Sequence, residues 1–138
     1  MVIAKRLTLN TNGYGHTLNL TPGVERALRE TPLAAGVVTL FVIGSTAALT
    51  TIEYEDGAVN DLGRAFERVA PRDAEYEHHL RWGDDNGHSH VRAALLGPSL
   101  SVPFVGGQLT LGTWQQIILV DFDTRPRRRE VVAQFIGE

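Results

Sequence analysis

The sequence contains no cysteine, which excludes disulfide bonds, thiolate catalysis and cysteine-bound zinc. It also lacks any apolar run near the ~20 residues that cross a membrane. The opening stretch "MVIAKRLTLN" has no signal-peptide core, so we expect a cytoplasmic protein with no membrane partner. Strong charge is absent as well. The formal net charge of −3 gives no reason to expect nucleic acid as a partner.

The remaining composition is typical of one globular domain. Hydrophobic residues make up 43% of the 138 positions and charged residues 21%, a balance found in folded rather than disordered chains. A chain of this length buries roughly 70% of its unfolded surface. Because no repeat, low-complexity tract or linker divides the sequence, we expect residues 1–138 to form a single domain.

Strand patterns occupy both ends of the chain. Apolar and β-branched composition predicts strands over residues 2–9, 16–20, 36–44, 99–105, 108–122 and 129–137. The segment 36–44 is nearly all apolar, which predicts a strand buried on both faces. Residues 46–55 continue the sheet as a second strand or an irregular extension. Pro103 predicts an edge or a bulge, because proline cannot donate to a strand ladder.

Helical patterns lie between these strands. Residues 21–30 have Thr21 as a possible cap and Pro22 at the first helical position. Residues 58–71 have apolar side chains at helical spacing and end at a proline. Residues 89–98 have Ser89 as a possible cap and Gly97 as a stop. The order of elements predicts an α+β fold with a mostly antiparallel sheet and two to three helices on one side.

Four of the five histidines lie within 13 residues of one another, around the acidic pair of "HHLRWGDDNGHSH". Imidazole and carboxylate groups are ligands for zinc and other divalent ions. The spacing matches neither a helical HExxH pair nor a zinc finger. The stretch therefore has two possible interpretations, a metal site or an exposed loop. Within the stretch we expect His90 at a site edge, and His88 and the two aspartates as ordinary loop residues.

The stretch "IGSTAALTTIEYED" is a second candidate. A hydrophobic strand ends at Gly44 and places Ser45 and Thr46 at the edge of the sheet. Small residues there permit close approach of a ligand. Glu53, further on, offers a general base or a metal ligand. The alternative is a bulge followed by a solvent-facing strand.

Two further stretches contain groups that bind heterocycles and phosphates. In "LGTWQQI", Trp114 is either a core residue or a stacking surface, and Gln115 faces outward or holds a hydrogen bond. In "RPRRRE", the arginines can bind phosphate or diphosphate through paired N–H donors. The alternative for the second stretch is an exposed turn between strands.

Taken together, "STAALTTIE", "HSHVRAALLG", "GGQLTLGTWQQIILVDFD" and "PRRREVVAQFIGE" resemble the YjbQ family. Members of this family are commonly called secondary thiamine-phosphate synthases. The resemblance covers nearly the whole chain and is most specific from His90 to Glu138. It implies a compact α+β domain, with the sheet folded into a sandwich or barrel, that assembles as a homotrimer.

The resemblance also implies the reaction and the site. The reaction joins hydroxymethylpyrimidine diphosphate to a thiazole phosphate, so the implied ligand is a small phosphorylated molecule. The implied catalytic residues are Glu53, His90 and Gln115. A divalent metal, zinc or magnesium, is expected at His79 and His90. The residues expected to bind substrate are Ser45, Thr46, Trp114, Arg127 and Arg129.

The chain departs from the family pattern at two positions. Family members usually carry a histidine where this chain has Gly44, and an asparagine where it has Ile52. Loss of one imidazole predicts weaker metal binding. Two other functions therefore stay open. One is a metal-assisted hydrolase of a phosphorylated small molecule, and the other is a trimeric small-ligand or metal-binding protein without catalysis.

Overall fold

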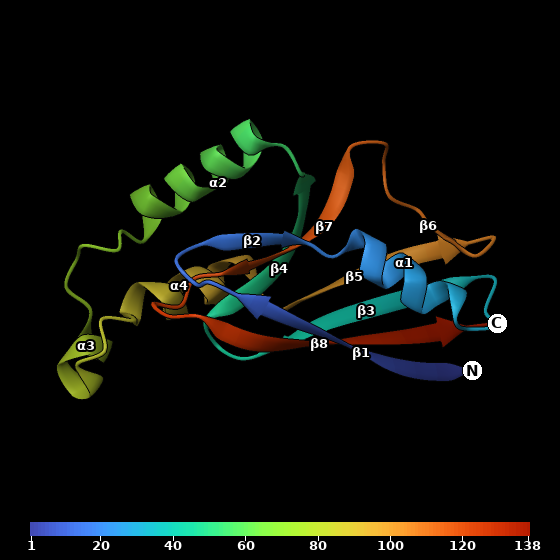
Figure 1. Ribbon diagram of the computed structural model, residues 1–138, viewed down its shortest axis with the longest axis horizontal. Helices are drawn as coiled ribbons and strands as arrows, with labels where there is room; N and C mark the ends of the chain where they lie inside the picture. Colours follow the sequence, from blue (N-terminus) through green and yellow to red (C-terminus); the bar gives the residue numbers. More distant parts are fainter.

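The computed structural model describes residues 1–138 (Figure 1). Eight strands are present: β1 (Val2–Thr11), β2 (His16–Asn19), β3 (Gly36–Ile43), β4 (Ala47–Glu53), β5 (Ser99–Val105), β6 (Gln108–Leu109), β7 (Gln115–Asp121) and β8 (Arg127–Gly137). Four helices connect them: α1 (Thr21–Arg29), α2 (Asp56–Val69), α3 (Glu77–Trp82) and α4 (Gly87–Leu96). None of the helices is long and apolar enough to cross a membrane.

The strands form two antiparallel sheets, which confirms the predicted α+β class. The larger sheet has the order β1-β8-β3-β5-β6 and the smaller one β2-β7-β4. Together they curl around a common interior, as Figure 1 shows. Pro103 lies in β5, whose outer neighbour is the two-residue strand β6. Strand β6 pairs only with Phe104 and Val105, so Pro103 has a strand partner on one side alone, as expected for an edge.

Two hydrophobic clusters hold the layers together. The larger cluster has 17 buried residues and joins the facing sides of both sheets with α1. The smaller one packs the opposite face of β4 and β7 against α2 and α4, with Phe66 and Phe122 in edge-to-face contact at 4.9 Å. The small sheet is therefore covered on both faces. The helices lie on two sides of it, and the expectation that they gather on one side is wrong.

The strand that is buried on both faces is β7, not β3. In β7, Ile117 to Asp121 are all buried. In β3 burial alternates, and Phe41 and Ile43 keep 47% and 45% of their surface exposed. The reason is position: β3 lies in the large sheet, whose outer face no element of the chain covers. An apolar run alone does not distinguish these two situations.

Both proposed hydroxyl caps are wrong, because one hydroxyl bonds to β7 and the other to the residue that follows it. Thr21 is the first residue of α1, and its Oγ1 accepts a hydrogen bond from the backbone N–H of Ile117 at 2.8 Å. Ser89 lies inside α4, and its Oγ donates to the carbonyl oxygen of Phe122 at 2.5 Å. These side chains attach the helices to β7 and to the residue that follows it.

Other boundaries differ from the sequence-based expectation. The short helix α3 forms in the histidine-rich stretch and buries none of its six residues. The predicted strand 108–122 is interrupted, because residues 110–114 form a turn between β6 and β7. Helix α2 starts at Asp56, where the carboxylate of Glu55 accepts hydrogen bonds from the N–H groups of Gly57 and Ala58.

Candidate functional site

The predicted site residues fall into two groups at opposite ends of the small sheet. One group, which we call the Glu53 end, contains Glu53, Trp114 and Gln115. The other, which we call the arginine end, contains Ser45, Thr46, Arg127 and Arg129. Strands β4 and β7 pair along their whole length between the two ends, from Ala47 opposite Asp121 to Glu53 opposite Gln115. At ~3.4 Å per residue this separation is about 20 Å.

The Glu53 end is exposed and has one firmly held side chain. Gln115 Nε2 donates to Thr51 Oγ1 at 3.0 Å, and its Oε1 accepts from the N–H of Gly112 at 3.1 Å. The amide therefore shapes the turn before β7. Trp114 is not a core residue, because 71% of its surface is exposed. The carboxylate of Glu53 is also exposed, at the last position of β4.

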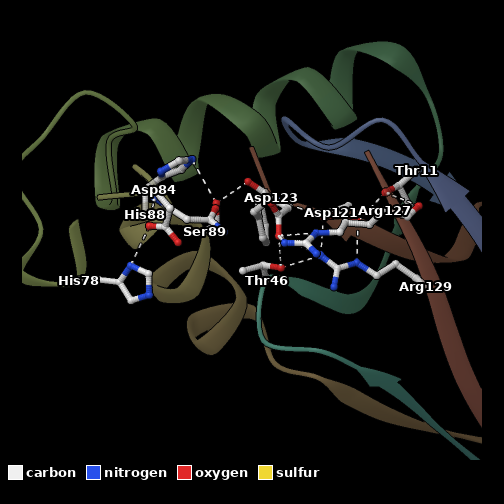
Figure 2. A network of polar contacts seen from close by, with 12 residues as sticks. Thr11, Thr46, His78, Asp84, His88, Ser89, Asp121, Asp123, Arg127 and Arg129 are labelled. Carbon is white, nitrogen blue, oxygen red and sulfur yellow. Dashed lines mark hydrogen bonds and ion pairs between the residues drawn. The ribbon is translucent and has the colours of Figure 1, made fainter. Parts of the chain in front are cut away.

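The arginine end is a buried ionic network (Figure 2). Arg129 binds Asp121 through two hydrogen bonds, from Nε at 2.7 Å and from Nη2 at 2.9 Å, and Nη2 also donates to Thr46 Oγ1 at 2.6 Å. Thr46 in turn donates to Asp123 Oδ2 at 2.8 Å, and Arg127 Nε donates to the same oxygen at 3.0 Å. Both arginines are thus fixed by carboxylates of their own chain.

The two aspartates were missed in the sequence, although a signal for them exists. In "DFDTRPRRR", Asp121 and Asp123 are two residues apart at the end of a strand, so they project from the same face. Burial acts to raise the pKa of Asp123, but hydrogen bonds from Thr46 and Arg127 and the charge of Arg127 outweigh it. The pKa of Asp123 therefore lies below its ordinary value.

Gly44 leaves room for the guanidinium of Arg129. Its φ is +139°, and a Cβ added there would lie 2.7 Å from Nη1 of Arg129. Nη1 is the one guanidinium nitrogen of Arg129 that makes no hydrogen bond. In Figure 2 it has no dashed line and points away from the aspartates. The arginine therefore occupies space that a side chain at position 44 would need.

The histidines lie beside the arginine end, since α4 begins next to Phe122 and Asp123. The ring beside His90 is that of His78, with 4.5 Å between ring centroids, rather than that of His79. His78 Nδ1 lies 3.3 Å from Asp84 Oδ1. His79 Nδ1 accepts a hydrogen bond from the N–H of Asp85 at 3.1 Å. The structure thus records no contact between the two expected metal ligands.

His88 is not the loop residue that the sequence analysis expected. It lies in α4 with 3% of its surface exposed. Burial, and then the charges of Arg92 and Arg72, hold the pKa of His88 below its ordinary value. Because Ser89 donates its proton to Phe122, its Oγ can accept from Nε2 of His88 at 3.3 Å. Nδ1 then has a free lone pair and no partner.

The fit of a metal ion to these residues is incomplete within one chain. No group of three or more histidine, aspartate or glutamate side chains is arranged to hold one. A catalytic zinc site uses three protein ligands and an open position. His79 and His90 supply two at most, and the space at position 44 is taken by Arg129. No chemical step is therefore derived through a metal.

Two open clefts lie near the network. A cleft of about 550 Å³ between α2 and the small sheet is lined by Tyr14, Phe66 and Phe122, among others. Another, of about 480 Å³, lies beside α3 and includes His79. Neither cleft includes Glu53, Gln115, Arg127 or Arg129. The two ends described above are therefore not walls of one cleft in a single chain.

The fold and the two-ended arrangement define a small two-sheet α+β protein with a buried aspartate–arginine network. Residues 5–138 match the family described as UPF0047 protein YjbQ-like. The chain belongs to this family.

Individual relatives agree with the family match. A UPF0047 protein of Methanothermobacter thermautotrophicus is 33% identical over 99% of this chain and 94% of its own length. YugU of Bacillus subtilis is 31% identical over 96% and 98%. Among solved structures, a YbjQ-like protein of unknown function from Sulfolobus solfataricus has a TM-score of 0.94 at 29% identity, covering 100% of this chain and 99% of its own.

Proposed function

We propose that this chain binds a small phosphorylated molecule at the arginine end, with the phosphate group on Arg129. One observation supports this proposal. Asp121 and Thr46 hold two nitrogens of the guanidinium, while Nη1 makes no hydrogen bond and lies beside Gly44, which has no side chain. A guanidinium fixed in this way offers its free donors to a phosphate oxygen with little further loss of side-chain entropy.

Arg127 is the second phosphate contact in this proposal. Its side chain is 34% exposed and pairs with Asp123 through Nη2 at 3.0 Å. The two arginine charges are balanced by the two aspartates, so the arginine end carries no large net charge of its own. We therefore expect affinity to depend on hydrogen-bond geometry more than on long-range attraction, and to fall only modestly with added salt.

We propose further that the ligand enters a thiamine-phosphate-synthase-like transfer. The bond between the pyrimidine methylene carbon and a diphosphate oxygen breaks, and diphosphate leaves with the electron pair. The thiazole nitrogen forms the new bond to that carbon. Arg127 and Arg129 receive the diphosphate. His90, at the start of α4 beside the arginine end, contacts polar groups of the ligand. Trp114, Glu53 and Gln115 lie about 20 Å away in the same chain, so their contact with the heterocycle stays a prediction from the resemblance.

Binding can be tested with inorganic pyrophosphate by isothermal titration calorimetry. Arg127→Ala should weaken binding by about tenfold or more, because it removes a charge-assisted contact. Arg128→Ala is the matched control. Arg128 is the next residue along β8, with 67% of its side chain exposed and only a 3.7 Å ion pair to Glu130. Equal affinity of the two variants, or no binding by the native chain, would contradict the proposal.

Turnover is a separate test. The native chain is incubated with hydroxymethylpyrimidine diphosphate and thiazole phosphate, and thiamine phosphate is measured by thiochrome fluorescence. We expect product with the native chain and at least tenfold less with Glu53→Gln. Pyrophosphate binding without product would support the non-catalytic alternative and reject the transfer reaction.

A divalent ion at His79 and His90 stays a prediction. Two imidazoles leave coordination positions for water or phosphate oxygens, and zinc or magnesium would then add positive charge beside the ligand. Elemental analysis of the purified chain checks this, with His90→Ala as the variant expected to lose the ion. The homotrimer and the cytoplasmic location implied above also stay predictions. Native mass spectrometry and cell fractionation test them.

A further inference from the structure

We propose that the cleft between α2 and the small sheet is a second binding site, and that it takes a small aromatic carboxylate. The cleft lies where α2 stands apart from the strands of the small sheet (Figure 1). Its volume of about 550 Å³ is within the range of small-molecule sites. None of its lining residues belongs to the arginine end or to the Glu53 end.

Helix α2 leaves part of its apolar face to this cleft. Phe66 is the one buried residue of the helix, and it packs on Phe122 of the segment after β7. Leu62 and Val59 precede Phe66 by four and seven positions, so they lie on the same helix face. Both are only partly buried, and both line the cleft. The helix therefore presents to the cleft an apolar surface that the core of the chain does not cover.

Glycines keep the cleft open on two of its walls. Gly63 lies in the middle of α2, and Gly15 lies in the turn before β2. A Cβ added at either position would meet nothing within 4 Å. The φ of +83° explains glycine at position 15. No such reason applies to Gly63, because glycine inside a helix is destabilising and no neighbour requires it. Room for a ligand is the physical use of that position.

Aromatic rings form the floor and one side of the cleft. Phe66 and Phe122 meet edge to face at 4.9 Å and form its buried floor. Tyr14 stands at the side with 57% of its surface exposed. The guanidinium of Arg72 lies 4.6 Å from the centre of the Tyr14 ring, a cation–π contact that holds the ring in place. Such rings favour a flat aromatic body in the ligand.

One fixed arginine supplies a free donor to the same cleft. Arg92 keeps only 11% of its side chain exposed. Its Nε donates to the carbonyl oxygen of Ala70 at 2.9 Å, and its Nη2 donates to Glu67 Oε2 at 2.6 Å. Nη1 makes no hydrogen bond and is not a buried atom. The guanidinium lies 6.0 Å from the centre of the Phe122 ring, so the free donor is next to the aromatic floor.

The charge of the lining selects a carboxylate. Its charged residues are Arg64, Glu67 and Arg92, which sum to one positive charge. A carboxylate carries one negative charge and accepts the geometry of a guanidinium donor. A phosphate monoester carries about −1.5 to −2 at neutral pH. Part of that charge would stay unmatched beside apolar groups, which is costly. The cleft therefore differs in ligand class from the arginine end.

Naphthoate is a suitable probe, because it joins a flat aromatic body to one carboxylate. Naphthamide has the same shape without the charge, so it serves as the control ligand. Each is titrated into the native chain and followed by two-dimensional NMR of the backbone amides. We expect saturable shifts centred on Gly15, Gly63 and Arg92. Naphthamide should bind about tenfold or more weakly, because it loses the charge-assisted hydrogen bond.

Gly63→Leu tests the position of the site, because leucine fills open space in the cleft and is a better helix former than glycine. It should weaken naphthoate binding by about tenfold or more, as loss of the ligand's place in the pocket does. Ala65→Leu is the matched control. Ala65 is an exposed residue of the same helix that does not line the cleft, so naphthoate affinity should be unchanged.

Three results would overturn the inference: no saturable binding of naphthoate, equal affinity for naphthoate and naphthamide, or equal affinity of the two leucine variants. A fourth is displacement of naphthoate by inorganic pyrophosphate, which would place the carboxylate at the arginine end. We expect pyrophosphate to leave naphthoate affinity unchanged. None of these readings requires the chain to bind pyrophosphate or to turn over a substrate. Failure of the second site is therefore distinguishable from failure of the proposed function.

Discussion

The absence of a side chain at Gly44 allows the guanidinium of Arg129 to take its observed position. Three hydrogen bonds to Asp121 and Thr46 fix the guanidinium, and Gly44 leaves room for its last nitrogen. A histidine at this position would require Arg129 to move away from partners that are themselves buried. Glycine here and the observed arginine geometry therefore depend on each other. The guanidinium of Arg129, on β8, thus fills the space beside the end of β3.

Replacing Gly44 with alanine should destabilise the fold. The backbone φ of +139° disfavours any side chain, and the new Cβ would meet Nη1 of Arg129 at 2.7 Å. We expect the free energy of unfolding to fall by about 1–3 kcal/mol in urea denaturation. Pyrophosphate affinity should fall as well, because Arg129 must shift.

Gly63→Ala is the matched control for this substitution. Gly63 lies inside α2, and a Cβ there meets nothing within 4 Å. Alanine should stabilise the helix by roughly 0.5–1 kcal/mol. If Gly44→Ala proved as harmless as Gly63→Ala, the close approach of Arg129 to Gly44 would be wrong.

At the scale of elements, the sequence predicted helices and strands correctly where the local hydrophobic pattern alone decides the structure. The apolar spacing of residues 58–71 predicted α2, and the turn residues placed most strands within a few positions. The caps were predicted incorrectly because the hydroxyls of Thr21 and Ser89 bond to backbone groups far away in the sequence. Likewise, the burial of β3 and β7 depends on which layers cover each sheet. A local pattern carries no information on those layers.

The candidate site shows the same limit. The residue types at both ends could be named from the sequence, including the arginines and the Trp-Gln pair. The distance between the two ends could not be predicted from the sequence, because it follows from the antiparallel pairing of β4 with β7. His88 was misread because its burial comes from the packing of α4 against the segment after β7, not from its neighbours in the chain.

The N-terminus of α2 offers a test at the element scale. The carboxylate of Glu55 accepts hydrogen bonds from Gly57 and Ala58 at 2.6 and 2.8 Å, and a negative charge there is favoured by the helix dipole. Glu55→Ala should lower the free energy of unfolding by about 1 kcal/mol and the Tm by about 3–5 °C. Differential scanning calorimetry measures both.

Glu75→Ala serves as the control, since Glu75 is exposed and outside every helix. It should leave the Tm within about 1 °C of the native value. Equal Tm values for the two variants would show that Glu55 does not cap α2.

For the molecule as a whole, the buried titratable groups predict a stability that falls toward acid in two steps. Burial and nearby arginines lower the pKa of His88 in the folded state below the ~6.5 of an unfolded histidine. The unfolded chain therefore binds more protons than the folded chain between these two pKa values. The contribution of His88 to the free energy of unfolding is complete above about pH 6.5 and is lost as pH falls toward the folded-state pKa.

Asp123 contributes the second step. The pKa of Asp123 is also lowered in the folded state, through Thr46 and Arg127 acting against burial. Its contribution is complete above the ~3.9 of an unfolded aspartate and is lost below it. Stability should thus decline first below about pH 6.5 and decline again below about pH 3.9.

Urea unfolding at fixed protein concentration from pH 4 to pH 8 isolates the first step. His88→Gln should flatten the dependence between pH 6.5 and the lower limit, because it removes the group that titrates there. His79→Gln, at an exposed histidine of α3, should leave the native slope unchanged. Two-dimensional NMR of the imidazole resonances then gives the folded-state pKa of His88 directly. A value at or above 6.5, together with an unchanged slope in His88→Gln, would show that the packing of α4 does not exclude the charged imidazole.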